Sequence, residues 1–224
     1  MEKSYIVQPE FRALGFSSGI VCEIHGIEIP EKSEPLEELK NSTLTMVLDL
    51  EDAALRTDPV LEGYRSQVAS IERSAKKFPP AAESLIQLIR RTRRFPTINV
   101  AVDAYNITVC HAHLALGVHD LDQLSGAITF RLSPGGESFR AVGSDTVKQT
   151  APGDYLYADE ARVLAWLDAK DSDEVKLSRM TKNVLIVIQG TSRTSRIDTR
   201  AAIEDAAKRI VTFCGGAFEI QEVI

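Results

Sequence analysis

The sequence predicts a mixed α/β or α+β fold in which a helical cluster stands between an N-terminal strand region and a region made mainly of strands. Gly19 to Ile29 is rich in β-branched residues, and the segments between Leu36 and Arg94 have helical periodicity. Val184 to Ile188 is a continuous apolar run, typical of a strand buried on both faces. The length of 224 residues allows one large domain or two fused subdomains. We expect a single domain, 1–224, with a strand and helical part at 1–94 and the core at 95–224.

The first elements are one or two strands and a long helix. The run Gly19 to Ile29 is expected to break at Gly26, and His25 is expected to be an exposed strand residue rather than a ligand. A charged, proline-bounded link follows. From Leu36 to about Leu55, leucines and valine recur with helical spacing, which predicts one long helix.

Two further helices open with local signals. Asp58 is expected as an N-cap with Pro59 in the first helical position, and Pro80 precedes a stripe of apolar residues. The second helix ends in arginines, which complement the negative end of the helix dipole and need no ligand. Clustered cations are equally typical of a phosphate-contacting surface, so both interpretations stay open. The cations are Arg90, Arg91, Arg93 and Arg94, preceded by Arg73, Lys76 and Lys77.

The stretch from Phe95 to Leu132 carries the densest set of unusual polar residues. Pro96 should end the preceding helix, and a new helix is expected from about Asn99. One of its faces is apolar apart from a phenol, and a second stripe is polar, although Asn and Asp are mediocre helix formers. The polar stripe therefore indicates a solvated face, hydrogen bonds that tie the helix to neighbouring loops, or the wall of a pocket. The apolar face comprises Val102, Tyr105, Val109, Ala112 and Leu116, and the polar stripe comprises Asn99, Asp103, Asn106, Cys110 and His113.

Beyond this helix the sequence predicts mainly strands. Gly117 and a polar corner at His119 to Asp122 lead into a strand from Ala127 to Leu132, and Ser133 to Glu137 is expected to form a hairpin turn. Short strands are expected between Asp154 and Leu167, with a break at Asp159, followed by a charged loop from Lys170 to Lys176. A final helix, capped by Asp198, is expected to end near Cys214, before Gly215. A last strand should begin at Ala217.

Composition restricts the function classes. The net charge of -6 argues against a generic nucleic-acid coat, because non-specific binding depends on neutralising phosphates, and no DNA partner is expected. Three cysteines lie far apart, which favours a reducing cytoplasm over a disulfide framework. No apolar run approaches the roughly 20 residues that span a bilayer, so we expect a soluble, unprocessed protein without a membrane partner.

A cluster of potential ligands and nucleophiles falls within the central stretch. His111 and His113 are two residues apart, which on a helix directs them to different sides, so no metal or cofactor is expected. Cys110 and His113 have a helical offset that suits a thiol and its base, but a mid-helix cysteine is equally an inert small hydrophobe. The cluster also contains His119, Asp120 and Asp122.

Several motifs in this region occur together in one known family. Asn99, Val102, Asp103 and Asn106 match N-x-x-V-D-x-x-N, and Asp120 to Leu124 matches a D-L-D-K-L corner except at Gln123. Together they resemble the B3/B4 domain of the phenylalanyl-tRNA synthetase beta subunit. The similarity is strongest from about Pro96 to Gly190, and it includes P-G-D-x-x-Y-A-D at Pro152 to Asp159 and T-x-N-V-L-I-V-I-Q-G at Thr181 to Gly190.

The resemblance implies a B3/B4-like α+β fold with a mainly antiparallel sheet region, a helical cluster and a closing C-terminal helix and strand. In the synthetase, this domain hydrolyses the wrong aminoacyl ester on tRNA with a positioned water. The editing-site histidine aligns with Gly117, and a glutamate that recognises the tyrosine hydroxyl aligns with about Val187. Their loss should remove discrimination for a phenol, and His119 could partly replace the imidazole.

The leading hypothesis is a trans-editing-like aminoacyl-tRNA deacylase; no motif of the full synthetase is present, so an aminoacylating enzyme is not expected. The rival is a non-catalytic module that keeps the fold and binds RNA or an amino acid. The expected partners are tRNA or aminoacyl-tRNA, or a small amino-acid ligand. The expected substrate-binding residues are Asn99, Asp103, Tyr105, Asn106, Gly117, His119, Asp120, Trp166 and Val187, with Arg90, Arg91, Arg93 and Arg94 on the RNA.

Overall fold

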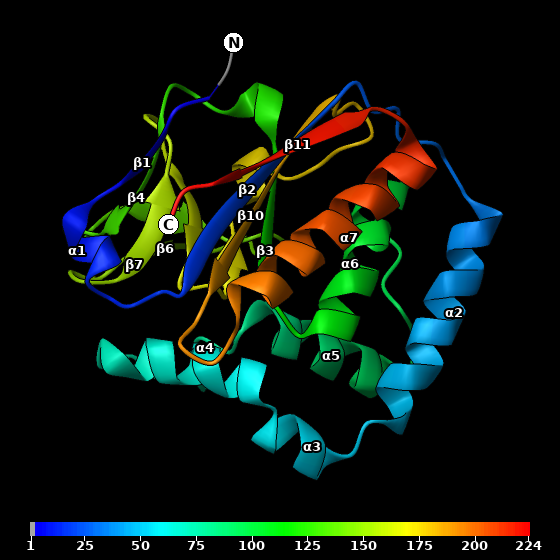
Figure 1. The fold of residues 1–224 in the computed structure, drawn as a ribbon, viewed down its shortest axis with the longest axis horizontal. Coiled ribbons are helices and arrows are strands. Elements are labelled where there is room, and N and C mark those ends of the chain that lie inside the picture. Colours follow the sequence, from blue (N-terminus) through cyan, green and yellow to red (C-terminus); the bar gives the residue numbers. More distant parts are fainter. Residues whose placement is uncertain (1–2) are drawn as a thin grey trace.

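The computed structural model describes residues 3–224 and consists of a central sheet between a second sheet and a layer of helices (Figure 1). The central sheet has the strand order β11-β2-β10-β3, and all of its neighbouring pairs are antiparallel. These strands are β2 (Ser18–His25), β3 (Leu116–Asp120), β10 (Asn183–Gly190) and β11 (Ala217–Glu222). The predicted α+β class and the final helix and strand are confirmed.

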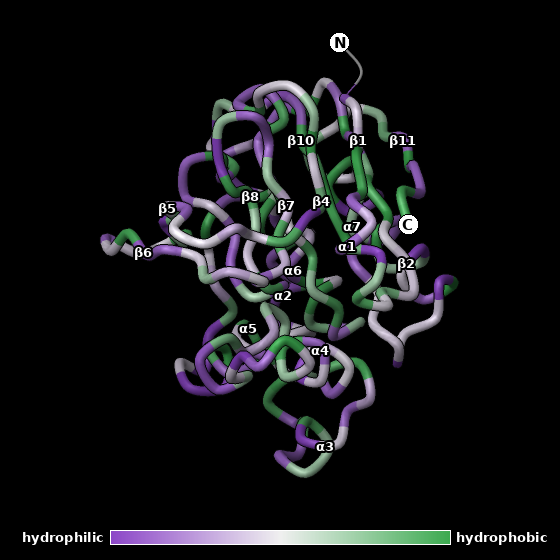
Figure 2. The backbone as a smooth tube through the Cα atoms, turned by 90° about the vertical axis from the view of Figure 1, so that its left-hand side faces the viewer, coloured by the Kyte–Doolittle hydropathy of each residue, from purple (hydrophilic) through white to green (hydrophobic). Residues whose placement is uncertain are grey.

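Both faces of the central sheet are buried at β10, which explains the unbroken apolar run in this strand. Val184, Ile186 and Ile188 pack into the core beneath the helices. Leu185 and Val187 point the opposite way, into a separate core shared with the second sheet. This alternation is the period-2 geometry of a strand, and Figure 2 shows the hydrophobic stretch of β10 in the interior of the molecule.

The second sheet has the strand order β1-β4-β7-β8-β9, in which only the pair of β1 and β4 is parallel. Its core is rich in rings: Phe11 stacks on Phe16, and Phe130 lies 5.2 Å from Tyr157 between ring centroids. The strands are β1 (Tyr5–Val7), β4 (Ile128–Leu132), β7 (Tyr155–Ala158), β8 (Val163–Trp166) and β9 (Lys170–Asp171). A separate hairpin is formed by β5 (Ser138–Arg140) and β6 (Val147–Gln149).

The helices cover the other face of the central sheet. The final helix, α7 (Arg196–Cys214), contacts β2 and β10, and α6 (Val100–Ala112) packs beside it. Outside α6 lie α2 (Glu34–Asp49) and α5 (Ala81–Thr92). The remaining elements are α1 (Pro9–Arg12), α3 (Asp52–Thr57), α4 (Pro59–Ser70), and the 3-10 turns η1 (Leu121–Gln123) and η2 (Asp173–Val175).

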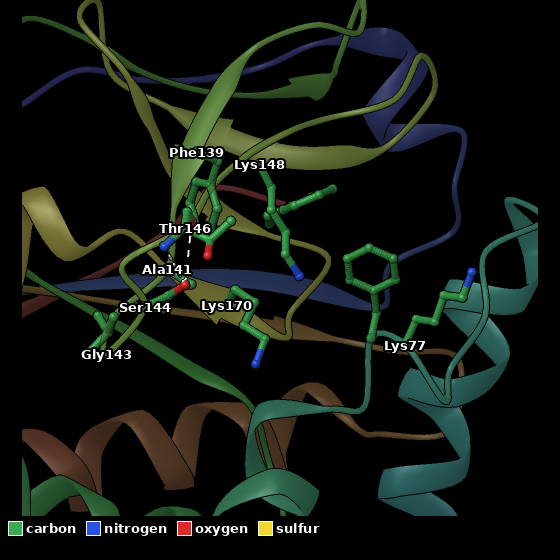
Figure 3. A pocket seen from close by; sticks show the side chains of 11 residues that line it. Lys77, Phe139, Ala141, Gly143, Ser144, Thr146, Lys148 and Lys170 are labelled. Carbon is green, nitrogen blue, oxygen red and sulfur yellow. Dashed lines mark hydrogen bonds between the residues drawn. The ribbon is translucent and has the colours of Figure 1, made fainter.

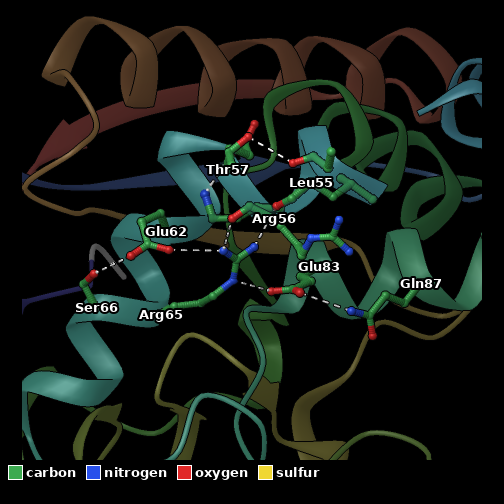
Figure 4. Close-up of polar contacts among 11 residues, drawn as sticks. Leu55, Arg56, Thr57, Glu62, Arg65, Ser66, Glu83 and Gln87 are labelled. Carbon is green, nitrogen blue, oxygen red and sulfur yellow. Dashed lines mark hydrogen bonds and ion pairs between the residues drawn. The ribbon is translucent and has the colours of Figure 1, made fainter. Parts of the chain in front are cut away.

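Local signals place several helix boundaries correctly. Asp58 caps α4 by accepting from the Leu61 backbone N–H at 2.9 Å, and Pro59 occupies the first turn. Arg65 of α4 then holds its neighbours: its guanidinium donates to the carbonyls of Leu55 and Arg56 at the end of α3, and to Glu83 of α5 at 3.0 Å (Figure 4). Three helices are thereby joined by one side chain.

Other predicted boundaries are wrong. The single helix expected to about Leu55 ends at Asp49, because Leu50 adopts an extended backbone and a second helix, α3, begins at Asp52. α2 also begins earlier, at Glu34, with Pro35 in its first turn, where proline is favoured. The cap of α7 is Ser195, whose hydroxyl accepts from the Asp198 backbone N–H; Asp198 instead accepts from that hydroxyl.

The expected hairpin at Ser133 to Glu137 is also wrong. The strands on either side, β4 and β5, belong to different sheets and do not pair. The segment is held by the Ser133 hydroxyl instead. This hydroxyl lies 2.7 Å from the Thr150 hydroxyl, and the Gly135 backbone N–H donates to Ser133 Oγ at 2.9 Å. Gly135 has φ +91, which favours glycine.

Within residues 3–224, no helix combines the length and apolarity that crossing a bilayer requires.

Candidate functional site

A small cavity lies between the two sheets, where the glycine of β3 faces the second sheet. Gly117 and Val187 are direct cross-strand partners in the pairing of β3 with β10, and both line this cavity. We call it the inter-sheet cavity. Its volume is about 40 Å³, and because a water molecule needs about 10–15 Å³ of such space, it has the size for water rather than for an amino-acid side chain. The other lining residues are Ala81, Ala115, Leu116, Tyr157, Ala165, Asp168, Lys170, Asp171 and Gln189.

The phenol of Tyr157 fills the space beside Gly117. A Cβ atom at position 117 would collide with Tyr157 Oη, so the glycine is required by this contact. His119 Nε2 lies 2.7 Å from the same oxygen, and burial lowers the pKa of His119 to about 3, so the imidazole is neutral. His119 Nδ1 is buried without a hydrogen-bond partner in residues 3–224. In the tautomer with its proton on Nε2, His119 donates to the phenol and the phenolic hydrogen of Tyr157 is free to donate into the cavity that Tyr157 lines.

Two aspartates supply the acidic groups of the cavity. Burial raises the pKa of Asp168 to about 7, and the charge of Asp171 acts in the same direction. Burial also raises the pKa of Asp171 to about 7, against a hydrogen bond from the Val118 backbone N–H that favours the ionised form. Both residues retain some exposure, whereas Asp168 Oδ2 is buried without a hydrogen-bond partner in the described chain. Carboxyl groups whose pKa lies near neutral pH are suited to proton transfer.

The backbone that presents these aspartates is unusual. Leu167 and Asp168 both have positive φ, 58° and 50°, although neither is glycine. Non-glycine residues with positive φ are rare, because this conformation costs free energy. They cluster at functional sites, where the surrounding structure enforces the conformation. Here the enforcement comes from the buried side chain of Leu167 and from Ala81 of α5, whose backbone N–H donates to the Asp168 carbonyl at 3.0 Å.

Of the sequence-predicted site residues, only Gly117 and Val187 line the inter-sheet cavity. His119 is wholly buried and reaches it through Tyr157. Asp120 lies at the corner after β3, where it caps η1 and accepts from the Thr181 hydroxyl at 2.7 Å. Its contacts therefore fix the backbone around the site.

The polar stripe of α6 is explained by contacts with neighbouring elements. Asn99 is the N-cap, accepting from the Val102 backbone N–H at 3.0 Å. Asp103 is buried and pairs with Lys40 of α2 at 2.8 Å. Burial raises the pKa of Asp103; burial disfavours the charged form of Lys40 as well, but its hydrogen bonds to Asp103 and Glu37 outweigh this and raise its pKa. These side chains hold α6 against α2 and do not line the cavity.

The other two predicted site residues of α6 also pack against the protein interior. Asn106 is buried, and Tyr105 packs against the helical core. Burial raises the pKa of Tyr105, and the charges of Asp171 and Asp103 add to this. Leu116, expected on the apolar face of this helix, instead lies in β3, because the helix ends at Ala112 and His113 adopts φ 57.

Trp166 lines a different and larger pocket. This pocket has a volume of about 440 Å³ and lies beside the inter-sheet cavity, with Lys170 in both linings. Trp166 and Val187, both expected at one substrate site, therefore line two different spaces.

The basic residues do not form one patch. α5 has 12 residues, which corresponds to about 18 Å, and its two ends carry different cations. Arg90 pairs with Asp52, and the exposed Arg91, Arg93 and Arg94 lie at the C-terminal end. Arg73, Lys76 and Lys77 precede the N-terminal end, where Arg73 pairs with Asp154 at 2.6 Å. RNA contact by the four arginines stays a prediction.

The histidines near Cys110 face separate partners. His111 lies 3.3 Å from the Thr43 hydroxyl, and His113 pairs with Asp58 at 2.8 Å. Burial raises the pKa of the Cys110 thiol to about 12, which opposes thiolate formation. In residues 3–224, one set of three side chains has the spacing of metal ligands: Glu23, His25 and Glu219, on β2 and β11 away from the cavity.

Sequence reasoning missed the two aspartates and the role of Tyr157. The sequence places Asp171 in a charged loop and gives no separate signal for Asp168. Tyr157 is the tyrosine of the P-G-D-x-x-Y-A-D motif, so that similarity contained the available signal. The aspartates meet Gly117 only through the pairing of distant strands.

Comparisons with known proteins agree on the fold. A family model described as the B3/4 domain matches residues 63–215. Among solved structures, the chain is similar to an N-terminal fragment of the phenylalanyl-tRNA synthetase beta-subunit from Pyrococcus horikoshii, with a TM-score of 0.53 and 12% sequence identity. This match covers 100% of the present chain and 55% of that fragment, so the chain spans about half of its length. The search of curated proteins found no match.

Proposed function

Because this chain belongs to the B3/4 domain family, we propose that it hydrolyses the ester between an amino acid and the terminal ribose of a tRNA. The observation that supports this most directly is the inter-sheet cavity, where a water-sized space meets the Asp171 carboxyl group, whose pKa burial raises to about 7. A carboxylate with this pKa is suited to general-base catalysis near neutral pH. The site lies beside an open pocket that an ester could enter.

In the proposed reaction, Asp171 removes a proton from the water as its oxygen attacks the ester carbonyl carbon. The free phenolic hydrogen of Tyr157 donates to the developing oxyanion, while His119 holds the phenol in place. The bond between the carbonyl carbon and the ribose oxygen then breaks, and the ribose oxygen receives the proton from Asp171. The products are a free amino acid and uncharged tRNA, and no other reactant is consumed.

Asp171→Asn tests this role against a panel of misacylated tRNAs. Loss of a general base is expected to reduce kcat by at least about 100-fold. The rate of the unsubstituted protein should rise with pH and level off above about 7, because the base must be ionised. Asp173→Asn is the matched control, since Asp173 is two residues away and pairs with Lys176 on the surface.

The hydrolase proposal fails if the protein releases no amino acid above the buffer rate from any member of the panel. It also fails if Asp171→Asn is as active as the Asp173→Asn control.

A non-catalytic binding module is the second candidate. One observation favours it in the form of an RNA-binding module: the Tyr157 phenol occupies the space beside Gly117, and the remaining volume of about 40 Å³ leaves no room for the amino-acid side chain of a substrate. Thermal-shift measurements with amino acids and tRNA separate the candidates, because a ligand that binds only the folded state raises the unfolding temperature. A shift without turnover would favour the binding module.

A further inference from the structure

The larger pocket beside the cavity combines cations with aromatic rings. We call it the lysine–aromatic pocket. It is formed by the β5–β6 hairpin, the β8–β9 hairpin and the segment between α4 and α5 (Figure 3). Its volume of about 440 Å³ lies within the range of about 300–1,000 Å³ typical of small-molecule sites.

Three lysines give the pocket a positive charge in a chain whose net charge is -6. They are Lys77, Lys148 and Lys170, and no carboxylate is among the lining residues. All three are exposed, and none makes an ion pair or side-chain hydrogen bond with another part of the described chain, unlike Lys176 and Lys182. Figure 3 shows Lys148 and Lys170 reaching into the same space. Free ammonium groups around one hollow are suited to a phosphate.

The aromatic side of the pocket is fixed before any ligand arrives. The ring of Trp166 lies 5.0 Å from that of Phe78 and 5.6 Å from that of Phe139. Trp166 Nε1 donates to Asp154 Oδ2 at 2.9 Å, and Arg73 pairs with the same aspartate while lying over Phe78. Because these contacts already hold the rings in place, binding a planar ligand would cost the protein little side-chain conformational entropy.

We propose that the lysine–aromatic pocket binds a nucleotide, with its phosphate on the lysines and its base against Phe78, the one ring of the three that is not almost fully buried. Proteins that bind single-stranded RNA use two kinds of interaction: bases stack on aromatic side chains, and phosphates contact basic side chains such as lysine. Lys170 lines both spaces, so a nucleotide in the pocket lies next to the inter-sheet cavity. If the proposed hydrolysis holds, on which this last step rests, the nucleotide is the 3′-terminal adenosine of tRNA.

The only tryptophan of the chain is Trp166, which lines this pocket, so a ligand that binds there is expected to change the tryptophan emission. The unsubstituted protein is titrated with AMP, adenosine, inorganic phosphate and a short RNA ending in CCA, and each titration is repeated by calorimetry. AMP and the RNA are expected to bind saturably and to change the emission, with adenosine and phosphate at least about tenfold weaker. Tighter binding of the RNA identifies the RNA end as the source of the nucleotide, and tighter binding of AMP identifies a free nucleotide.

Lys148→Gln should weaken AMP and RNA binding by about tenfold, because it removes one charge-assisted contact. Lys208→Gln is the matched control, since it removes the same charge from α7. The proposal is overturned if neither fluorescence nor calorimetry detects AMP or RNA binding, if inorganic phosphate binds as tightly as AMP, or if both substitutions weaken binding equally. Asp171→Asn should leave nucleotide binding intact, so failure of hydrolysis and failure of this site are distinguishable.

Discussion

Asp168 and Asp171 make the stability of the protein dependent on pH. Burial raises the pKa of each from an ordinary 3.8 to about 7. The folded state therefore binds their protons more tightly than the unfolded state does. The stabilisation from the protonated groups is complete below about pH 4 and is lost as the pH rises through about 7. Above that pH, two carboxylates lie close together in a poorly hydrated site.

Asp168→Asn should therefore stabilise the protein at high pH. The amide is similar in shape and has no charge to desolvate, so the free energy of unfolding at pH 8 should increase by about 1–2 kcal/mol, allowing for the partial exposure of the residue. At pH 4 the change should be small. Urea unfolding at both pH values measures the difference, with the exposed Asp145→Asn as control. An equal effect of Asp168→Asn at both pH values would contradict the assignment.

At the scale of elements, β3 and β7 approach one another because one strand has no side chain where the other has a phenol. Gly117 lies opposite Val187 in the central sheet, and Tyr157 lies opposite Ala165 in the second sheet. The hydroxyl of Tyr157 occupies the place of the missing Cβ. This complementarity sets the separation of the two sheets at the cavity.

A double-mutant cycle tests that complementarity. Gly117→Ala alone should destabilise the protein by about 1–3 kcal/mol, because the new methyl group collides with Tyr157 Oη. In a Tyr157→Phe background the nearest ring atom, Cζ, is 3.2 Å from the added carbon, so the same substitution should cost less. The coupling energy from urea unfolding of the four proteins measures this. Additive effects would show that the hydroxyl does not occupy the space beside Gly117.

At the scale of the whole molecule, the central sheet belongs to two cores. Its helix-facing residues join α6 and α7, and its opposite face joins the aromatic core of the second sheet. β2 comes from the first part of the chain and pairs with β10 and β11 from the last part. We therefore propose that 1–224 is one domain, since neither part can complete the sheet alone.

Urea unfolding followed by two probes checks this. Trp166 fluorescence reports on the second sheet, and far-UV circular dichroism reports mainly on the helices on the opposite side. If the central sheet couples the two cores, both probes should show the same midpoint and slope. Transitions that separate by more than the experimental error would indicate two independently unfolding units.

Local chemistry in the sequence predicted elements better than it predicted the site. Asp58 with Pro59, Pro80 and Gly215 mark helix ends through nearby backbone groups, so their signals are contained in a few residues. The polar stripe of α6 could not be interpreted in this way. Asp103 meets Lys40 across 63 positions of sequence, and a buried ion pair has the same helical spacing as a pocket wall. The proximity of Gly117 and Val187 was expected only from the resemblance to a known domain.

Because the side chains of β10 alternate between two cores, a shift in the pairing register of this strand would be strongly destabilising. A displacement by one residue would direct the Gln189 amide toward the apolar helices and would remove Val187 from Gly117. A deletion in the loop ahead of Asn183 would therefore damage the cavity and the helix packing together. Length variation in this protein should consequently be confined to loops that do not set the register of β10.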